Sequence, residues 1–144
     1  VVDIERIGDY CKNILDLASA HPQRLRALDY EATLVEIETG IKQCFDQAVD
    51  VLREQDVETA RQVMRTYRKH VSEACDQIVS DVVRGKVDTL RPGDAAALAL
   101  YTRYVKRISA HLKNILSSVV NPFHRIGYKE KKRSTSEGRS SGAS

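Results

Sequence analysis

The stretch Glu5–Leu15, ERIGDYCKNIL, returns 101 residues later at Lys106–Leu116 as KRISAHLKNIL, with six of eleven positions identical. Shared apolar residues alone would follow from the periodicity that any two amphipathic helices have in common. Periodicity does not require the shared polar residues Arg6, Lys12 and Asn13, however. The sequence therefore indicates a duplicated helix, and a chance match between two unrelated helices is the less favoured alternative.

Apolar residues recur at spacings of three and four along most of the chain, which predicts an all-α protein. The connections are short, so we expect an antiparallel bundle of four long helices. Gly40 is expected to mark a close contact between helices. The expected helices cover residues 2–19, residues 30–54, a third span from an N-cap at Asp56 to Gly85, and a fourth from an N-cap at Asp94 to Asn121. We assign residues 1–128 to the bundle and 129–144 to a flexible, basic Ser/Gly-rich tail.

The first helix is expected to bury a stripe of Ile4, Ile7, Cys11, Ile14 and Ala18. Together with Cys44 and Cys75, Cys11 is expected to be a buried free thiol, because the three cysteines share no metal-type spacing. No apolar run approaches the ~20 residues that a membrane span needs. These features predict a cytoplasmic protein.

The net charge of +3 comes from the tail, because the chain before Tyr128 balances its basic and acidic residues. A balanced body argues against a nucleic-acid-binding face. The chain also begins at Val1 directly in a helical pattern, without Met, which suggests a piece of a longer protein.

The segment Glu5–Ile14 resembles the ERIGDH-x-x-NI signature of the PhoU family, whose members regulate phosphate uptake. The resemblance implies three-helix repeats that carry the signature on their third helix. Residues 1–19 would then be the last helix of one repeat, and residues 28–121 would be the whole of the next. The Asp-x-x-x-Ala start at Asp56 and Ala60 is also similar to the family. Related helical regions are fused to sodium/phosphate cotransporters, so the resemblance leaves the parent protein open.

The resemblance also implies a metal site, because E(D)xxxD pairs of the family are implicated in binding metal, sometimes as iron clusters. Glu5 and Asp9 have this spacing. Carboxylates four apart on a helix can converge on one hard cation, so we expect a divalent or iron-type metal there. The alternative is a solvated acidic flank neutralised by Lys12. No other cofactor is expected.

The second copy departs from the family, because Lys106 and Ala110 occupy the positions that match Glu5 and Asp9. Arg68 likewise stands where a carboxylate is expected. Positive charges repel a metal ion, so we expect none in this repeat.

The cations of the second copy, Arg68, Lys106 and Arg107, are instead candidates for binding an anion such as phosphate. The alternative is a salt-bridged face that involves Glu73 and Asp76. No glycine-rich phosphate loop or catalytic triad spacing is present, and we expect no enzyme activity.

The expected function is a regulatory, protein-interaction module in phosphate transport or phosphate signalling. Its expected partners are a phosphate transporter or sensor at the cytosolic face of the membrane, and a second copy of the chain. Two alternatives stay open: a structural or oligomerising bundle without a phosphate role, and the cytosolic domain of a sodium/phosphate cotransporter.

Overall fold

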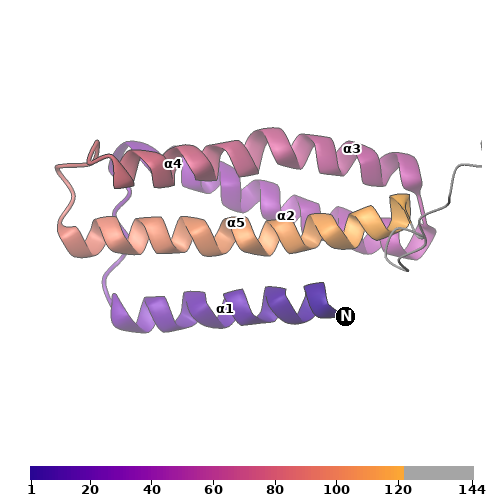
Figure 1. The fold of residues 1–144 in the computed structure, drawn as a ribbon, viewed down its shortest axis with the longest axis horizontal. Helices are drawn as coiled ribbons and strands as arrows, with labels where there is room; N and C mark the ends of the chain where they lie inside the picture. Colours follow the sequence, from indigo (N-terminus) through magenta and orange to yellow (C-terminus); the bar gives the residue numbers. More distant parts are fainter. Residues whose placement is uncertain (122–144) are drawn as a thin grey trace, which may run out of the picture.

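The computed structural model describes residues 1–121, apart from the side chains of Arg68 and Lys69. The described residues are helical, without strands, as the sequence predicts. The end of the predicted bundle beyond Asn121 and the predicted tail at 129–144 lie outside these residues. The helices (Figure 1) are α1 (Val2–Ala20), η1 (Leu28–Tyr30), α2 (Glu31–Glu54), α3 (Val57–Tyr67), η2 (Arg68–Ser72), α4 (Glu73–Val83) and α5 (Pro92–Val120).

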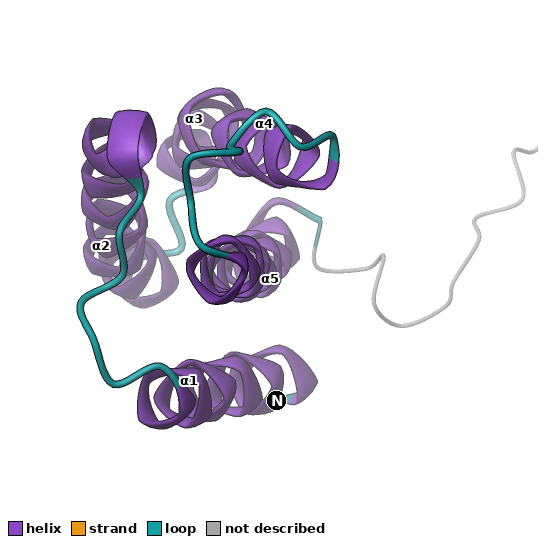
Figure 2. Cartoon of the chain, turned by 90° about the vertical axis from the view of Figure 1, so that its left-hand side faces the viewer, coloured by secondary structure: helices purple, strands orange, loops and turns teal. Residues whose placement is uncertain are grey.

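Helix α5 is the centre of the arrangement, because it contacts α1, α2, α3 and α4. Figure 2 shows α2 and the α3–α4 rod on one side of α5, and α1 on the other. The rod runs antiparallel to α2, and α1 runs antiparallel to α5 (Figure 1). Residues 28–120 thus form a three-helix unit, and α1 is a fourth helix packed against its last member.

The core lies within the three-helix unit, where apolar residues of α2, the rod and α5 meet. Helix α5 alone contributes ten buried residues, and α1 contributes none. Burial of this kind is the main favourable term in folding. The fully buried side chains of the core include Ile37, Val51, Val71, Ile78, Leu98 and Leu116.

The third predicted helix is one continuous rod that contains a π-helical segment, η2, between α3 and α4. The buried residues Val63, Tyr67, Val71 and Cys75 are each four apart, which drifts out of phase on a regular α-helix. The i→i+5 bonding of a π-segment widens the turn and keeps residues four apart on one side. Gly40 of α2 faces this segment, because a Cβ atom on Gly40 would lie 3.1 Å from Val71 Cγ2. The predicted close contact at Gly40 is confirmed.

Two predicted helix boundaries have different outcomes. Asp56 is a side-chain cap, because its Oδ1 atom accepts hydrogen bonds from the backbone N–H groups of Glu58 and Thr59, at 3.1 Å each. Asp94 is not a cap: α5 begins two residues earlier at Pro92, with Arg91 as its N-cap. Proline is favoured at the first helical position, because its missing N–H group would have no partner there. Asp94 therefore lies inside the first turn of α5, and its side chain is buried.

The predicted stripe of α1 is wrong in most of its members. Ile7 and Ile14 pack partly against the core, but Ile4, Cys11 and Ala18 are exposed. The prediction of three buried thiols therefore fails at Cys11, which belongs to a helix that packs mainly on α5. The other two thiols, Cys44 and Cys75, are buried. Burial raises the pKa of Cys44 to about 11 and that of Cys75 to about 12, so both stay protonated and unreactive at neutral pH.

A buried carboxylate joins the start of α2 to the end of α4. The Asp81 carboxylate accepts hydrogen bonds from Gln77 at 3.0 Å, Lys86 at 2.9 Å and the Tyr30 hydroxyl at 2.8 Å. Together these donors lower the pKa of Asp81 to about 2. The carboxylate is therefore ionised at neutral pH.

Substitution of two equivalent leucines measures how differently the duplicated helices are packed. Leu116 of α5 is 0% exposed, and its counterpart Leu15 of α1 is 69% exposed. We expect Leu116→Ala to lower the free energy of unfolding by about 2–5 kcal/mol, because it leaves a cavity. Leu15→Ala should change it by less than about 0.5 kcal/mol. Urea unfolding followed by circular dichroism measures both, and equal losses would contradict the packing described.

Candidate functional site

The predicted metal ligands Glu5 and Asp9 lie one turn apart on α1, and both are exposed. The Asp9 carboxylate also accepts a hydrogen bond from the Arg6 guanidinium at 3.4 Å. Among residues 1–121, no three His, Cys, Asp or Glu side chains lie together as a metal site requires. The two carboxylates thus offer part of a coordination shell, and metal binding by them stays a prediction.

The predicted anion ligands Lys106 and Arg107 lie next to each other on α5 but contact different helices. Lys106 forms an ion pair with Asp76 of α4, as the salt-bridge alternative predicts. The Arg107 Nε atom donates a hydrogen bond to the Tyr10 hydroxyl of α1 at 3.2 Å. Of Arg68 the structure describes only the backbone. An anion site built from these three residues stays a prediction, and it would compete with both contacts.

The middle of the α1–α5 interface is built from rings. The Tyr10 ring stacks on the His111 imidazole, with centroids 5.9 Å apart, and lies 6.2 Å from the Tyr104 ring. The Arg107 guanidinium lies over the Tyr10 ring, 5.8 Å from its centroid, which is a cation–π arrangement. These contacts define the register in which α1 lies along α5.

A polar contact closes the interface near the start of α1. An Asp3 carboxylate oxygen lies 3.0 Å from His111 Nδ1 and accepts a hydrogen bond from the Asn114 amide at 3.1 Å. The Asp3 and His111 side chains are each 13% exposed. Hydrogen bonds that involve a charged group in a partly dry interface are stronger than those between neutral groups in water.

The contacts between α1 and α5 follow the internal duplication. A shift of 101 residues carries Tyr10 onto His111 and Asp3 onto Tyr104. The Asp3–His111 contact therefore corresponds to the Tyr104–Tyr10 contact, and both are present. Tyr10 and His111, which contact each other, are counterparts. The two copies of the repeated helix therefore pack antiparallel around a local two-fold axis near this ring pair, as expected for a structural duplication.

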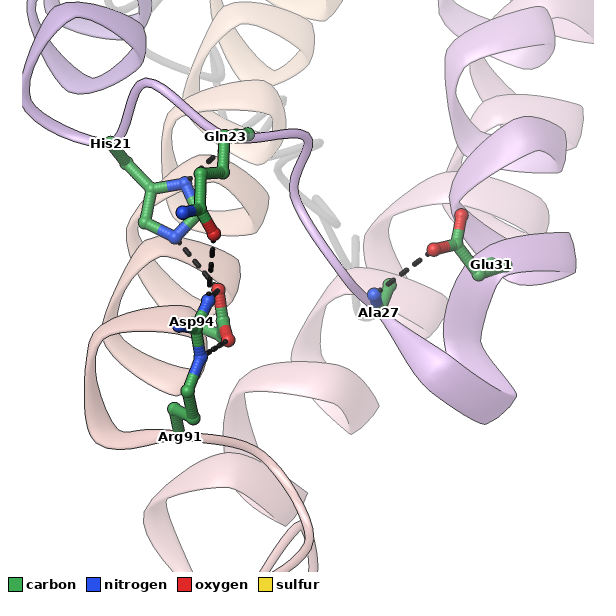
Figure 3. Close-up of polar contacts among 6 residues, drawn as sticks. All are labelled: His21, Gln23, Ala27, Glu31, Arg91 and Asp94. Carbon is green, nitrogen blue, oxygen red and sulfur yellow. Dashed lines mark hydrogen bonds and ion pairs between the residues drawn. The ribbon is translucent and has the colours of Figure 1, made fainter.

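A second polar cluster, formed by His21, Gln23, Arg91 and Asp94, joins the end of α1 to the start of α5 (Figure 3). The Asp94 side chain is 3% exposed, and its carboxylate lies 2.8 Å from both Arg91 Nε and His21 Nε2. Arg91, followed by His21, lowers the pKa of Asp94 below its usual range. The opposite His21 nitrogen, Nδ1, lies 3.1 Å from the Gln23 carbonyl oxygen. Both ring nitrogens thus face acceptors, and both bonds form at once only with the imidazolium.

A groove lies over α5 between α1 and α2. A hollow of about 380 Å³ is lined mainly by apolar side chains from both helices and from the 21–30 connection, among them Ile14, Leu25, Leu34 and Val35. A second hollow of about 410 Å³ follows along α2 and α5 and is lined by Ile41, Phe45, Val105 and Ile108. Tyr101 and Glu38, whose side chains are hydrogen-bonded at 2.5 Å, line both hollows.

Sequence reasoning did not find the His21–Asp94 and His111–Asp3 contacts, which join residues 73 and 108 positions apart. The duplication indicates that the two copies are related helices, but it does not show which pair of counterparts lies at their axis. It therefore contained no signal for the Asp3–His111 contact. The polar cluster at His21 lies outside the duplication, because its partner Asp94 precedes the repeated segment.

We predict that Asp94→Asn lowers the melting temperature at pH 7, because an amide cannot satisfy the Arg91 and His21 donors as a carboxylate does. The pKa of Asp94 is lowered on folding, so its contribution is present above the usual aspartate pKa of about 3.9 and is lost as the pH falls. The difference between variant and wild type should therefore shrink between pH 7 and pH 2.5. Thermal unfolding at both values measures it, with the exposed Asp88→Asn as control.

Manganese titration tests the metal prediction, because α2 offers a matched control pair. Asp46 and Asp50 are also exposed and four apart. If Glu5 and Asp9 form a metal site, replacing both by Ala should abolish the tightest calorimetric binding phase, whereas Asp46→Ala/Asp50→Ala should preserve it. If the two double variants have equal effects, manganese binding is a general property of carboxylate pairs on exposed helices, and the prediction of a specific site at Glu5 and Asp9 is contradicted.

The model of the PhoU domain matches residues 34–119, more than half of the chain. No curated protein and no solved structure matches the chain significantly. The matched residues span α2, the rod and α5 up to Val119, which is the three-helix unit described above. The chain therefore belongs to the PhoU family, as the resemblance of Glu5–Ile14 to its signature predicts.

Proposed function

We propose that this chain regulates phosphate transport or phosphate signalling by docking to a phosphate transporter or sensor. The support at the level of the family is the PhoU domain, which is a phosphate-related regulatory module rather than a catalytic one. The support at the level of the chain is the groove over α5. The proposal places the chain in the cytoplasm, at the inner face of the membrane that holds its partner.

The groove suits an amphipathic helix of such a partner. Its floor is apolar and consists of Tyr101, Val105 and Ile108 of α5, beside Ile41 and Phe45 of α2. Polar groups lie at its edges, among them Glu31, Glu38 and Arg24. A helix that lays an apolar face on such a floor gains hydrophobic burial, and the edge residues define its register. None of the described helices is long and apolar enough to cross a membrane.

The competing function is a structural or oligomerising bundle without a phosphate role. A third candidate, the cytosolic domain of a sodium/phosphate cotransporter, shares the docking chemistry but is covalently joined to its partner. Loss of the chain separates the first two, because only a regulator changes the response of the cell to phosphate. The sequence of the parent gene separates the third.

Two aspartate substitutions on α2 test the docking groove. Val35 lines the groove and is 59% exposed, whereas Val49 lies outside it and is 54% exposed. We expect Val35→Asp to abolish regulation and Val49→Asp to preserve it, because only the first places a charge where an apolar partner surface must pack. The readout is phosphate uptake and a phosphate-starvation reporter in cells that lack the native gene.

Co-purification of the transporter or sensor with each variant provides the physical measurement. If both variants restore regulation equally, the partner does not dock in the groove. If the wild-type chain does not change the phosphate response, the structural bundle becomes the better account.

A further inference from the structure

Charge is distributed unevenly among the helices, although the chain before Tyr128 is balanced as a whole. Helix α2 contains six acidic residues and two basic ones. Residues 59–72 of the rod contain four Lys or Arg residues and no acidic one, and residues 95–120 of α5 have the same content. These two stretches pack against each other, because α5 contacts both α3 and η2 (Figure 1). The α3–α5 contact is therefore a basic side of the bundle, which a charge balance taken over the whole chain conceals.

Three of these cations surround one hollow between α3 and the second half of α5. The hollow has a volume of about 360 Å³ and is lined by three basic and two apolar side chains, those of Arg61, Arg65, Lys113, Met64 and Val120. The two apolar side chains are half-buried and pack against the hydrophobic core. The hollow thus combines positive groups with apolar surface, and we call these five residues the basic hollow.

The described part of the protein neutralises the basic hollow poorly. Arg61 and Arg65 share one carboxylate, that of Glu58, at 3.9 and 3.6 Å. These three side chains are between 55% and 76% exposed, so their ion pairs are weak. Within residues 1–121, the Lys113 ammonium forms no ion pair. Neighbouring like charges repel each other, so an anion bound in the hollow would stabilise the arrangement.

We propose that the basic hollow binds an anionic membrane surface, with the phosphate groups of acidic lipids against its cations. An arginine side chain can bind two phosphate oxygens through parallel N–H groups, and the Lys113 ammonium adds a third positive charge. Met64 and Val120 lie beside these cations. A surface that combines cations with apolar side chains suits the boundary between lipid headgroups and acyl chains, because both kinds of contact contribute to binding there.

Charge argues against the following segment of the chain as the occupant of the hollow. Residues 122–144 contain six Lys or Arg residues and two acidic ones, so this segment has the same sign as the hollow. The contributions of neighbouring cations to binding at an anionic membrane accumulate, so the segment should strengthen the lipid contact. The acidic helix α2 of a second copy is the competing occupant, and it would produce self-association of the chain.

The lipid contact does not rest on the proposed docking to a transporter or sensor. The groove of that proposal lies over α5 between α1 and α2, whereas the basic hollow lies between α5 and α3. Vesicles made of lipid alone contain no protein partner. A failure of the lipid contact in such vesicles therefore leaves the docking proposal standing, and the reverse also holds.

Co-sedimentation of the full chain with vesicles tests the proposal. We expect the chain to bind vesicles of phosphatidylcholine that contain phosphatidylglycerol, and to bind pure phosphatidylcholine vesicles far less. Rising salt concentration should weaken the binding. Arg61→Gln/Arg65→Gln should weaken it about twentyfold, because each cation near an anionic surface contributes about fivefold. The control is Lys42→Gln/Arg53→Gln, which removes the same charge from exposed positions on α2 and should have little effect.

Four results would overturn the proposal. The first is equal binding to the two kinds of vesicle, or binding to neither. The second is an equal loss in the two double variants, which would mean that binding follows net charge rather than the hollow. The third is release of the chain from vesicles by inorganic phosphate but not by sulfate at the same ionic strength, which would assign the hollow to a free anion. The fourth is self-association without vesicles that Arg61→Gln/Arg65→Gln abolishes. All four substituted side chains are exposed, so circular dichroism should show an unchanged helical fold.

Discussion

The whole arrangement depends on burial of one helix, α5, from two sides. Its apolar side joins α2 and the rod in a common core, and its other side meets α1 through rings and charged groups. Apolar burial is strong but not directional, so it does not by itself select a register. Hydrogen bonds and ring contacts are directional. The two sides of α5 therefore contribute differently. The apolar side stabilises the three-helix unit by burial, and the other side defines the position of α1 along α5.

Helix α1 is consequently the part of the described fold with the least burial. It has no buried residue, and its position depends on partly buried Ile7 and Ile14 and on polar contacts at both ends. Elements with few buried apolar contacts open at lower free energy than the core. Its contacts with Asp94 and His111 are therefore important for the shape of the groove, because α1 forms one wall of it.

The sequence predicts the helices well because periodicity, breakers and capping residues are local signals. The span of α2, the cap at Asp56, the end at Gly85 and the close approach at Gly40 are examples. The sequence is a poor guide to which side of α1 packs against the rest of the protein, and the reason is physical. Its residues suit two contact faces, and which face is covered depends on the neighbours rather than on the helix.

The candidate site shows the same division. The family pattern identifies four candidate residues, Glu5, Asp9, Lys106 and Arg107. It does not identify the residues that contact them, because a pattern along one helix contains no information about the neighbouring helix. Asp94 looked like a cap, because an aspartate near a helix start usually is one. Instead, its buried carboxylate contacts His21, 73 positions away.

The π-segment between α3 and α4 has a consequence for the history of the chain. Such a turn accommodates one extra residue while the helices before and after it keep the same side towards the core. A related chain one residue shorter at this point would form an unbroken α-helix with the same residues inside. Lengths of the rod in family members should therefore differ here by single residues without disturbing the bundle, which an ordinary stretch of α-helix would not tolerate.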